Sequence, residues 1–151
     1  NDNAAKAIDK QEVYPAPTKG FTEEVYKIYP KADKVGNATA VLVNSNGDRG
    51  VTMSWPVKQL PFLTQWKNTA AETTGYVTGI EPGTGFPHNR NYERKFGRVP
   101  KLAPGKTRSF DLGFRILGSK SEVESAVGDV KKLQGTTGPE IQKEPEALPD
   151  E

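Results

Sequence analysis

The feature that most constrains the fold is a strict alternation of apolar and polar side chains in residues 50–55. In an extended chain, large apolar side chains fall on one face and hydroxyl side chains on the other. A second β-forming run, residues 38–44, precedes it, and Asn46-Gly47 lies between the two. Asn-Gly favours a tight hairpin turn because both residues tolerate positive φ. The sequence therefore predicts a β-hairpin with these side chains on its apolar face: Val51, Met53 and Trp55.

Further runs of β-forming residues extend the hairpin into a larger fold. Strands are predicted for residues 25–29, 62–67 and 76–81. A strict alternation over residues 107–116 predicts a long antiparallel strand with one buried face. The 15 Gly and 12 Pro separate these runs with turns, which favours a mainly β architecture.

One helix is predicted near the C-terminal end of the chain. Ser121 and Glu124 form a capping-box pattern, and apolar residues then recur at helical spacing as far as Gly135. We expect this helix to pack on the sheet or the domain edge. The length of 151 residues favours one domain. We assign it to residues 21–135, after a polar lead-in formed by residues 1–20.

The charge is distributed unevenly along the chain. Residues 136–151 are Pro-rich and carry five carboxylates against Lys143, and we expect a disordered acidic tail. The tail has a net charge of −4, so the formal total of +2 leaves +6 on the remainder. Residues 86–108 hold seven basic side chains against Glu93 alone. Few aromatic residues interleave with them, so a solvated basic face or a site for an anionic sugar is favoured over nucleic-acid binding. Binding of an acidic polymer by an interaction domain is a third interpretation.

Composition excludes several kinds of chemistry. The chain has no cysteine and a single histidine, which excludes disulfides, thiolate sites and a multi-histidine metal site. No phosphate loop or dinucleotide fingerprint is present, so no cofactor is predicted. No apolar run approaches the roughly 18 residues that span a bilayer, so we expect a soluble protein that does not enter membranes. Whether it is cytoplasmic, periplasmic or secreted is left open.

Residues 75–90 concentrate the unusual chemistry of the chain. Glu81 follows strand-forming residues and precedes a run of turn residues, so a carboxylate is predicted at the end of a strand. His88, the only histidine, and Arg90 follow in the same loop. Together these groups are able to bind and deprotonate a polar ligand. The alternatives are that Glu81 caps or salt-bridges its own loop, and that Arg90 pairs with Glu93.

Two blocks of sequence, with a trailing third stretch, resemble a known family. Residues 50–55 with 60–68 look like paired strands that wall a sugar site, and residues 79–87 with Asn91 look like a strand ending in a glutamate and a Phe-Pro turn. Residues 102–107 fit a late turn. The chain thus resembles the C-terminal half of aldose 1-epimerase-like (galactose mutarotase-like) proteins, from a poorly characterised bacterial branch. The resemblance implies an antiparallel β-sandwich that a companion N-terminal half or a second chain completes, since strand edges would otherwise be exposed.

The resemblance also implies a chemistry. In the family a carboxylate removes the proton from the anomeric hydroxyl of a sugar while a histidine protonates the ring oxygen. Glu81 matches the catalytic base, and the histidine acids lie in the companion half. His88 stands where better-known members carry an aspartate, so the acid role does not transfer to it. The candidate contacts to the carbohydrate ligand are Trp66, Lys67, His88 and Arg90. The alternative is a carbohydrate-binding protein that has lost turnover.

Overall fold

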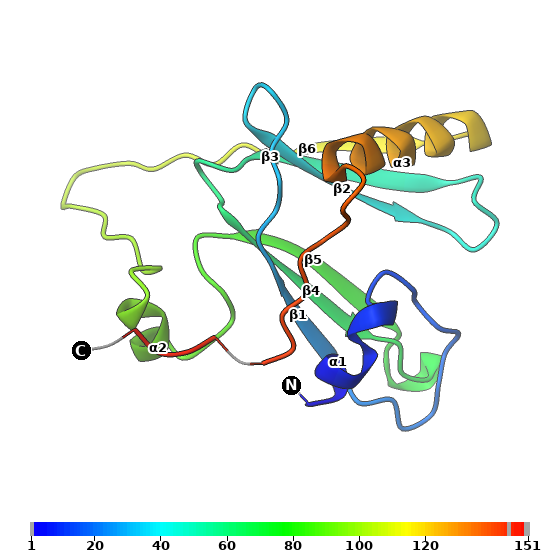
Figure 1. Cartoon of the computed structure of the whole chain (residues 1–151), viewed down its shortest axis with the longest axis horizontal. Helices are drawn as coiled ribbons and strands as arrows, with labels where there is room; N and C mark the ends of the chain where they lie inside the picture. Colours follow the sequence, from blue (N-terminus) through cyan, green and yellow to red (C-terminus); the bar gives the residue numbers. More distant parts are fainter. Residues whose placement is uncertain (1, 145, 150–151) are drawn as a thin grey trace. The chain divides into compact units, whose positions relative to one another are not determined.

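The computed structural model describes residues 2–144 and 146–149, which fall into two compact units. The first unit comprises residues 2–29 and 62–100 with the described residues from 140 onward, and the second comprises residues 30–61 and 101–139. Each unit is built on a three-stranded antiparallel sheet (Figure 1).

The sheet of the first unit has the strand order β1-β4-β5. Its strands are β1 (Glu24–Ile28), β4 (Phe62–Asn68) and β5 (Val77–Gly83). Short helices flank the sheet: α1 (Asp2–Ala7), η1 (Ile8–Lys10), η2 (Glu72–Thr74) and α2 (Arg90–Lys95). In the register of the sheet, Lys27 lies opposite Thr64, and Thr64 lies opposite Glu81. These three residues therefore form one row across the sheet, on one face.

The two faces of this sheet differ in character. Because neighbouring side chains of a strand point to opposite faces, Trp66 shares the face of Glu81, whereas Gln65 and Lys67 lie on the other. The N-terminal segment covers that other face, where Gln65 donates hydrogen bonds to Gln11 O and Tyr14 Oη, both at 2.9 Å. The sheet thus has one polar face sealed by the chain's own N-terminal segment.

The second unit packs a helix on a sheet of order β2-β3-β6. Its elements are β2 (Asn37–Val43), β3 (Gly50–Pro56), β6 (Gly113–Leu117) and α3 (Lys120–Gln134). Leu117, Val123 and Ala126 form its buried cluster, with Val41 and Val43 packed against them. The helix covers one face of the sheet, as predicted.

The predicted mainly β, antiparallel architecture with one C-terminal helix is confirmed, and so is the hairpin of β2 and β3. Its turn differs from the prediction, because Gly47 has φ +68° but Asn46 has no positive φ. The strands are instead joined by a longer loop, which a hydrogen bond of 3.0 Å from Asn44 N to Arg49 O closes. The turn therefore needs a left-handed conformation only at its glycine.

The predicted long strand over residues 107–116 is wrong in its first half. Pairing with β3 begins only at Gly113, opposite Ser54. Pro56 ends β3 and has no N–H to donate, so a longer β6 would lack a partner there. The predicted buried face is exposed, with Phe114 64% and Ile116 75% accessible. The helix packs on the opposite face.

The N-cap of the helix lies two residues before the predicted one. Ser119 Oγ accepts a hydrogen bond of 3.3 Å from Glu122 N, and the Glu122 carboxylate accepts one of 2.9 Å from Gly118 N. Hydrogen bonds from Gly118 N–H and the Ser119 hydroxyl lower the pKa of Glu122. The capping box is therefore formed by Ser119 and Glu122. The sequence did not distinguish this pair from Ser121 and Glu124, because both pairs have the three-residue spacing of a capping box.

Candidate functional site

Glu81 lies inside β5, two residues before its end. Pairing continues through Pro82 and Gly83, opposite Leu63 and Phe62, so the predicted position at the strand end is corrected. β5 is an edge strand, which is where a sheet tolerates a proline. Glu81 therefore stands on a rigid hydrogen-bonded strand at the sheet edge and is exposed.

The carboxylate of Glu81 occupies the space that a side chain at position 79 would fill, and residue 79 is a glycine. A Cβ at Gly79 would overlap Oε1 of Glu81 and would come within 2.9 Å of its carboxyl carbon. The carboxylate thus leans back along β5 over the glycine. Within the described part of the chain, the Glu81 carboxylate forms no hydrogen bond or ion pair, so it does not cap its own loop.

Trp66 is brought next to this carboxylate. It lies directly opposite Gly79 in the register of β4 and β5, on the face that Glu81 occupies. Its indole Nε1 donates a hydrogen bond of 2.8 Å to Glu23 Oε2, which fixes the ring on this face. The half-buried ring and the carboxylate cover neighbouring positions of the sheet. An aromatic plane beside a carboxylate is the combination that suits a ligand with both an apolar face and hydroxyl groups.

The loop after β5 is held by a buried ion pair between Glu93 and Arg98. Arg98 Nε lies 2.7 Å from Glu93 Oε2, and Phe86 N donates to the same oxygen at 2.9 Å. Glu93 and Arg98 are only 3% and 7% exposed. Burial alone would raise the pKa of Glu93, but the hydrogen bonds from Arg98 and Phe86 outweigh it and the pKa is lowered. The loop is therefore a fixed part of the unit.

His88 and Arg90 are both exposed on this loop. The His88 ring packs 4.7 Å from the Tyr92 ring, centroid to centroid. Partial burial there and the positive charge of Lys27 lower the pKa of His88, so the neutral imidazole is favoured. Arg90 begins α2, and the alternative pairing with Glu93 does not form because Arg98 occupies Glu93.

Lys67 lies on the face opposite Glu81 and is 2% exposed. Its Nζ is 3.2 Å from Glu24 Oε2, which also accepts a hydrogen bond of 2.7 Å from the Tyr26 hydroxyl. Burial, followed by the hydrogen bond to Glu24, raises the pKa of Tyr26. The ammonium also lies 5.4 Å from the centre of the Tyr14 ring. Lys67 is thus a buried structural cation beneath the N-terminal segment.

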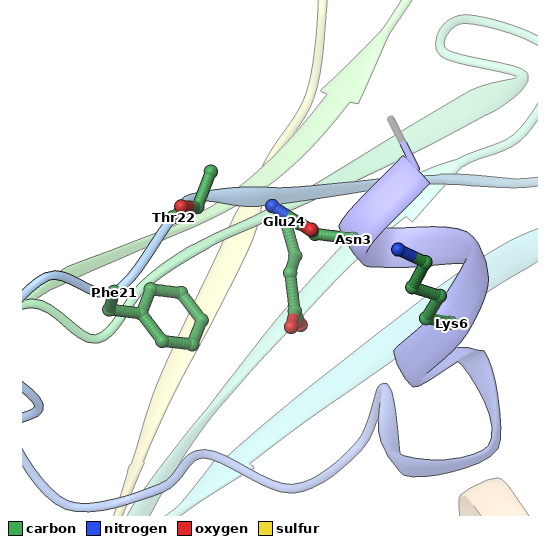
Figure 2. Close-up of a pocket in the computed structure, with 5 residues that line it drawn as sticks. All are labelled: Asn3, Lys6, Phe21, Thr22 and Glu24. Atoms are coloured by element: carbon green, nitrogen blue, oxygen red, sulfur yellow. The ribbon is translucent and has the colours of Figure 1, made fainter.

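A pocket of about 320 Å³ lies on that same opposite side, at the start of β1 (Figure 2). Figure 2 shows Glu24 between the Phe21 ring and Lys6 of α1. Because the Glu24 carboxylate is already bound by Tyr26 and Lys67, it is not available as a base. The remaining lining residues are Asn3 and Thr22. No sequence pattern indicated this pocket, because it depends on where α1 packs.

A second feature that sequence reasoning missed is the position of Glu146. Its carboxylate lies 2.8 Å from Arg98 Nη1 and accepts a hydrogen bond of 3.0 Å from the Tyr29 hydroxyl. Lys27 Nζ is 4.0 Å away. Burial raises the pKa of Glu146, but the bonds from Arg98 and Tyr29 outweigh this and lower it. The assignment of residues 136–151 to a disordered tail stays a prediction, as do the other domain boundaries.

Comparison with solved structures identifies the class of protein. The chain is similar to the crystal structure of a "putative aldose 1-epimerase" from Klebsiella pneumoniae subsp. pneumoniae MGH 78578, with a TM-score of 0.85 and 41% sequence identity. The similarity covers 89% of this chain and 35% of that one, so the chain spans about a third of its length. The fold is therefore aldose 1-epimerase-like, as the resemblance predicted.

The chain belongs to the family described as "Domain of unknown function (DUF4432)", which it matches over residues 1–116. Comparison with curated protein sequences gave no match. Among the residues that the structure describes, no helix has the length and apolar character to cross a membrane. Those residues also contain no group of three or more acidic, histidine or cysteine side chains arranged to hold a metal ion.

Proposed function

We propose that the chain is part of a protein that acts on the anomeric centre of a sugar, with Glu81 as the general base. The observation that carries the proposal is the exposed carboxylate of Glu81, which leans over Gly79 beside Trp66 on one face of the sheet. The 41% identity to a protein described as a "putative aldose 1-epimerase" supports the same class of reaction.

In the proposed step, Glu81 accepts the proton of the anomeric hydroxyl. The O–H electron pair forms the carbonyl, the bond between the anomeric carbon and the ring oxygen breaks, and an acid gives a proton to that oxygen. Rotation of the open chain and the reverse transfers then close the ring as the other anomer. Electrons and protons balance, because base and acid regain their starting states over one full cycle when the ring closes by the reverse route.

The remaining groups are assigned from their positions. Trp66 provides a surface for stacking on the sugar, and His88 and Arg90 on the loop after β5 are proposed as further contacts. The acid is expected from a companion N-terminal half or a second chain, as the resemblance implies. The predicted substrate contact of Lys67 gains no support on this face, because its side chain is buried on the other.

The test is the rate of anomer interconversion in the complete protein, measured by polarimetry with freshly dissolved sugar. The Glu81→Gln variant keeps the size of the side chain and removes the base, so the rate should fall about 10²- to 10⁴-fold. Glu72→Gln is the matched control, because Glu72 is also an exposed glutamate of this unit, in η2. A normal rate in Glu81→Gln would contradict the proposal. Retained sugar binding without turnover in the wild-type protein would favour the non-catalytic alternative.

A further inference from the structure

The chain contains a built site for a negatively charged group, and one of its own carboxylates occupies that site. Lys27, Tyr29 and Arg98 converge on the Glu146 carboxylate, at 4.0, 3.0 and 2.8 Å respectively. We call these three residues the anion site. Arg98 is 7% exposed and its guanidinium lies 4.1 Å from the centre of the Phe96 ring, so its orientation is fixed. Glu146 lies 48 residues after Arg98 in the sequence.

The charges of the anion site favour a ligand with a negative charge. Glu93 neutralises Arg98 through Nε and Nη2, which leaves the Nη1 edge for a second acceptor. Lys27 then adds a positive charge, which Glu146 offsets in the part of the chain that the structure describes. Guanidinium, phenol and ammonium donors around one point are suited to a carboxylate or a phosphate.

The anion site and Glu81 belong to the same face of the sheet. Lys27, Thr64 and Glu81 form one row across the three strands. Two strand spacings separate the first and last residue of the row, which puts their backbones about 10 Å apart. Tyr29 is two residues beyond Lys27, on the same face, where its ring packs edge-on against Phe62 at 5.6 Å. The anion site therefore lies at the β1 side of this face, across β4 from Glu81.

We propose that the anion site binds the carboxylate or phosphate of an acidic sugar derivative whose anomeric carbon lies at Glu81. Glu146 occupies the site in the free protein and is displaced by this ligand. The inference rests on the proposed function, since it takes Glu81 as the residue that faces the anomeric centre. It adds the substrate class, an acidic monosaccharide, and makes the C-terminal segment a competitor of the substrate.

The test measures binding of glucuronate, glucose 6-phosphate and glucose to the complete protein by isothermal titration calorimetry. Removing the competing charge in Glu146→Gln should tighten binding of at least one acidic sugar about tenfold and leave glucose unchanged. Adding Lys27→Gln to that variant should weaken the acidic sugar about tenfold. Glu144→Gln is the matched control, because Glu144 is an exposed carboxylate in the same segment. The two acidic sugars distinguish a carboxylate site from a phosphate site.

Equal affinity for glucose and both acidic sugars, in the wild type and in Glu146→Gln, would overturn the inference. Failure of both acidic sugars to bind at millimolar concentration would overturn it as well. The proposed function is tested separately by turnover: a protein that binds acidic sugars preferentially but does not interconvert their anomers has the anion site and lacks the proposed activity. A protein that interconverts anomers but binds neutral and acidic sugars with equal affinity has the activity and lacks the anion site.

Discussion

Replacing Gly79 with alanine should move the carboxylate of the proposed base without destabilising the sheet. Gly79 has no positive φ, so its backbone conformation is open to alanine. The added Cβ would overlap the Glu81 carboxylate, which is the free end of a flexible side chain. The methyl group is therefore accommodated by a movement of the carboxylate. The substitution should lower the rate of anomer interconversion and not the stability of the fold.

The two effects differ in sign. A glycine within a strand is less stable than an alanine by roughly 0.5–1 kcal/mol, so Gly79→Ala should leave the free energy of unfolding unchanged or slightly raised. A displacement of about 1 Å of a catalytic group can cost on the order of 10²-fold in rate, so anomer interconversion should fall by about that factor. Urea unfolding followed by circular dichroism gives the first quantity, and polarimetry with the complete protein gives the second.

Gly128→Ala is the control, because a Cβ at Gly128 in α3 would meet nothing within 4 Å. It should be neutral or stabilising and should leave the rate unchanged. A wild-type rate of anomer interconversion in Gly79→Ala would show that the glycine does not position the carboxylate. Unfolding of Gly79→Ala would show that the glycine serves the fold and not the carboxylate.

Three further predictions concern the stability of each unit, measured by urea unfolding. Leu117→Ala should cost about 2–5 kcal/mol, because the side chain is completely buried under α3. Ser119→Ala should cost about 1 kcal/mol by removing the acceptor of Glu122 N, and an unchanged value would mean that the cap lies elsewhere. Glu93→Gln should cost about 3 kcal/mol by leaving Arg98 short of its buried partner. Because the pKa of Glu93 is lower in the folded protein than the ordinary 4.5, wild-type stability should fall as the pH drops below about 4.5, and Glu93→Gln should lack this part of the loss.

Local patterns in the sequence predicted the strands well. The hairpin of β2 and β3 follows from alternation and a turn between neighbouring segments, and both are visible in a short window. Residues 107–116 carry the same alternation, yet only the part from Gly113 onward is a strand. Alternation says which side chains share a face, but it does not say whether a partner strand is present, and Pro56 removes that partner.

The β-forming runs predicted the strands that carry Trp66 and Glu81. That the two side chains share a face follows from the register of β4 and β5, which only the folded chain shows. The role of Lys67 was not predictable, because its partner Glu24 is far away in sequence and nothing local marks the pair. The same applies to Glu93. The sequence suggested an ion pair with Arg90, whereas Glu93 pairs with Arg98 in the folded chain. Long-range ion pairs need the folded chain.

A crystal structure of the complete protein with a bound sugar would decide whether Glu81 is the base. The Glu81 carboxylate should lie within hydrogen-bonding distance of the anomeric oxygen, about 2.6–3.2 Å. Trp66 should face the sugar ring. A sugar bound instead at Glu24 and Lys67, on the opposite face of the sheet, would contradict the proposed role of Glu81, and so would a sugar without contact to Glu81.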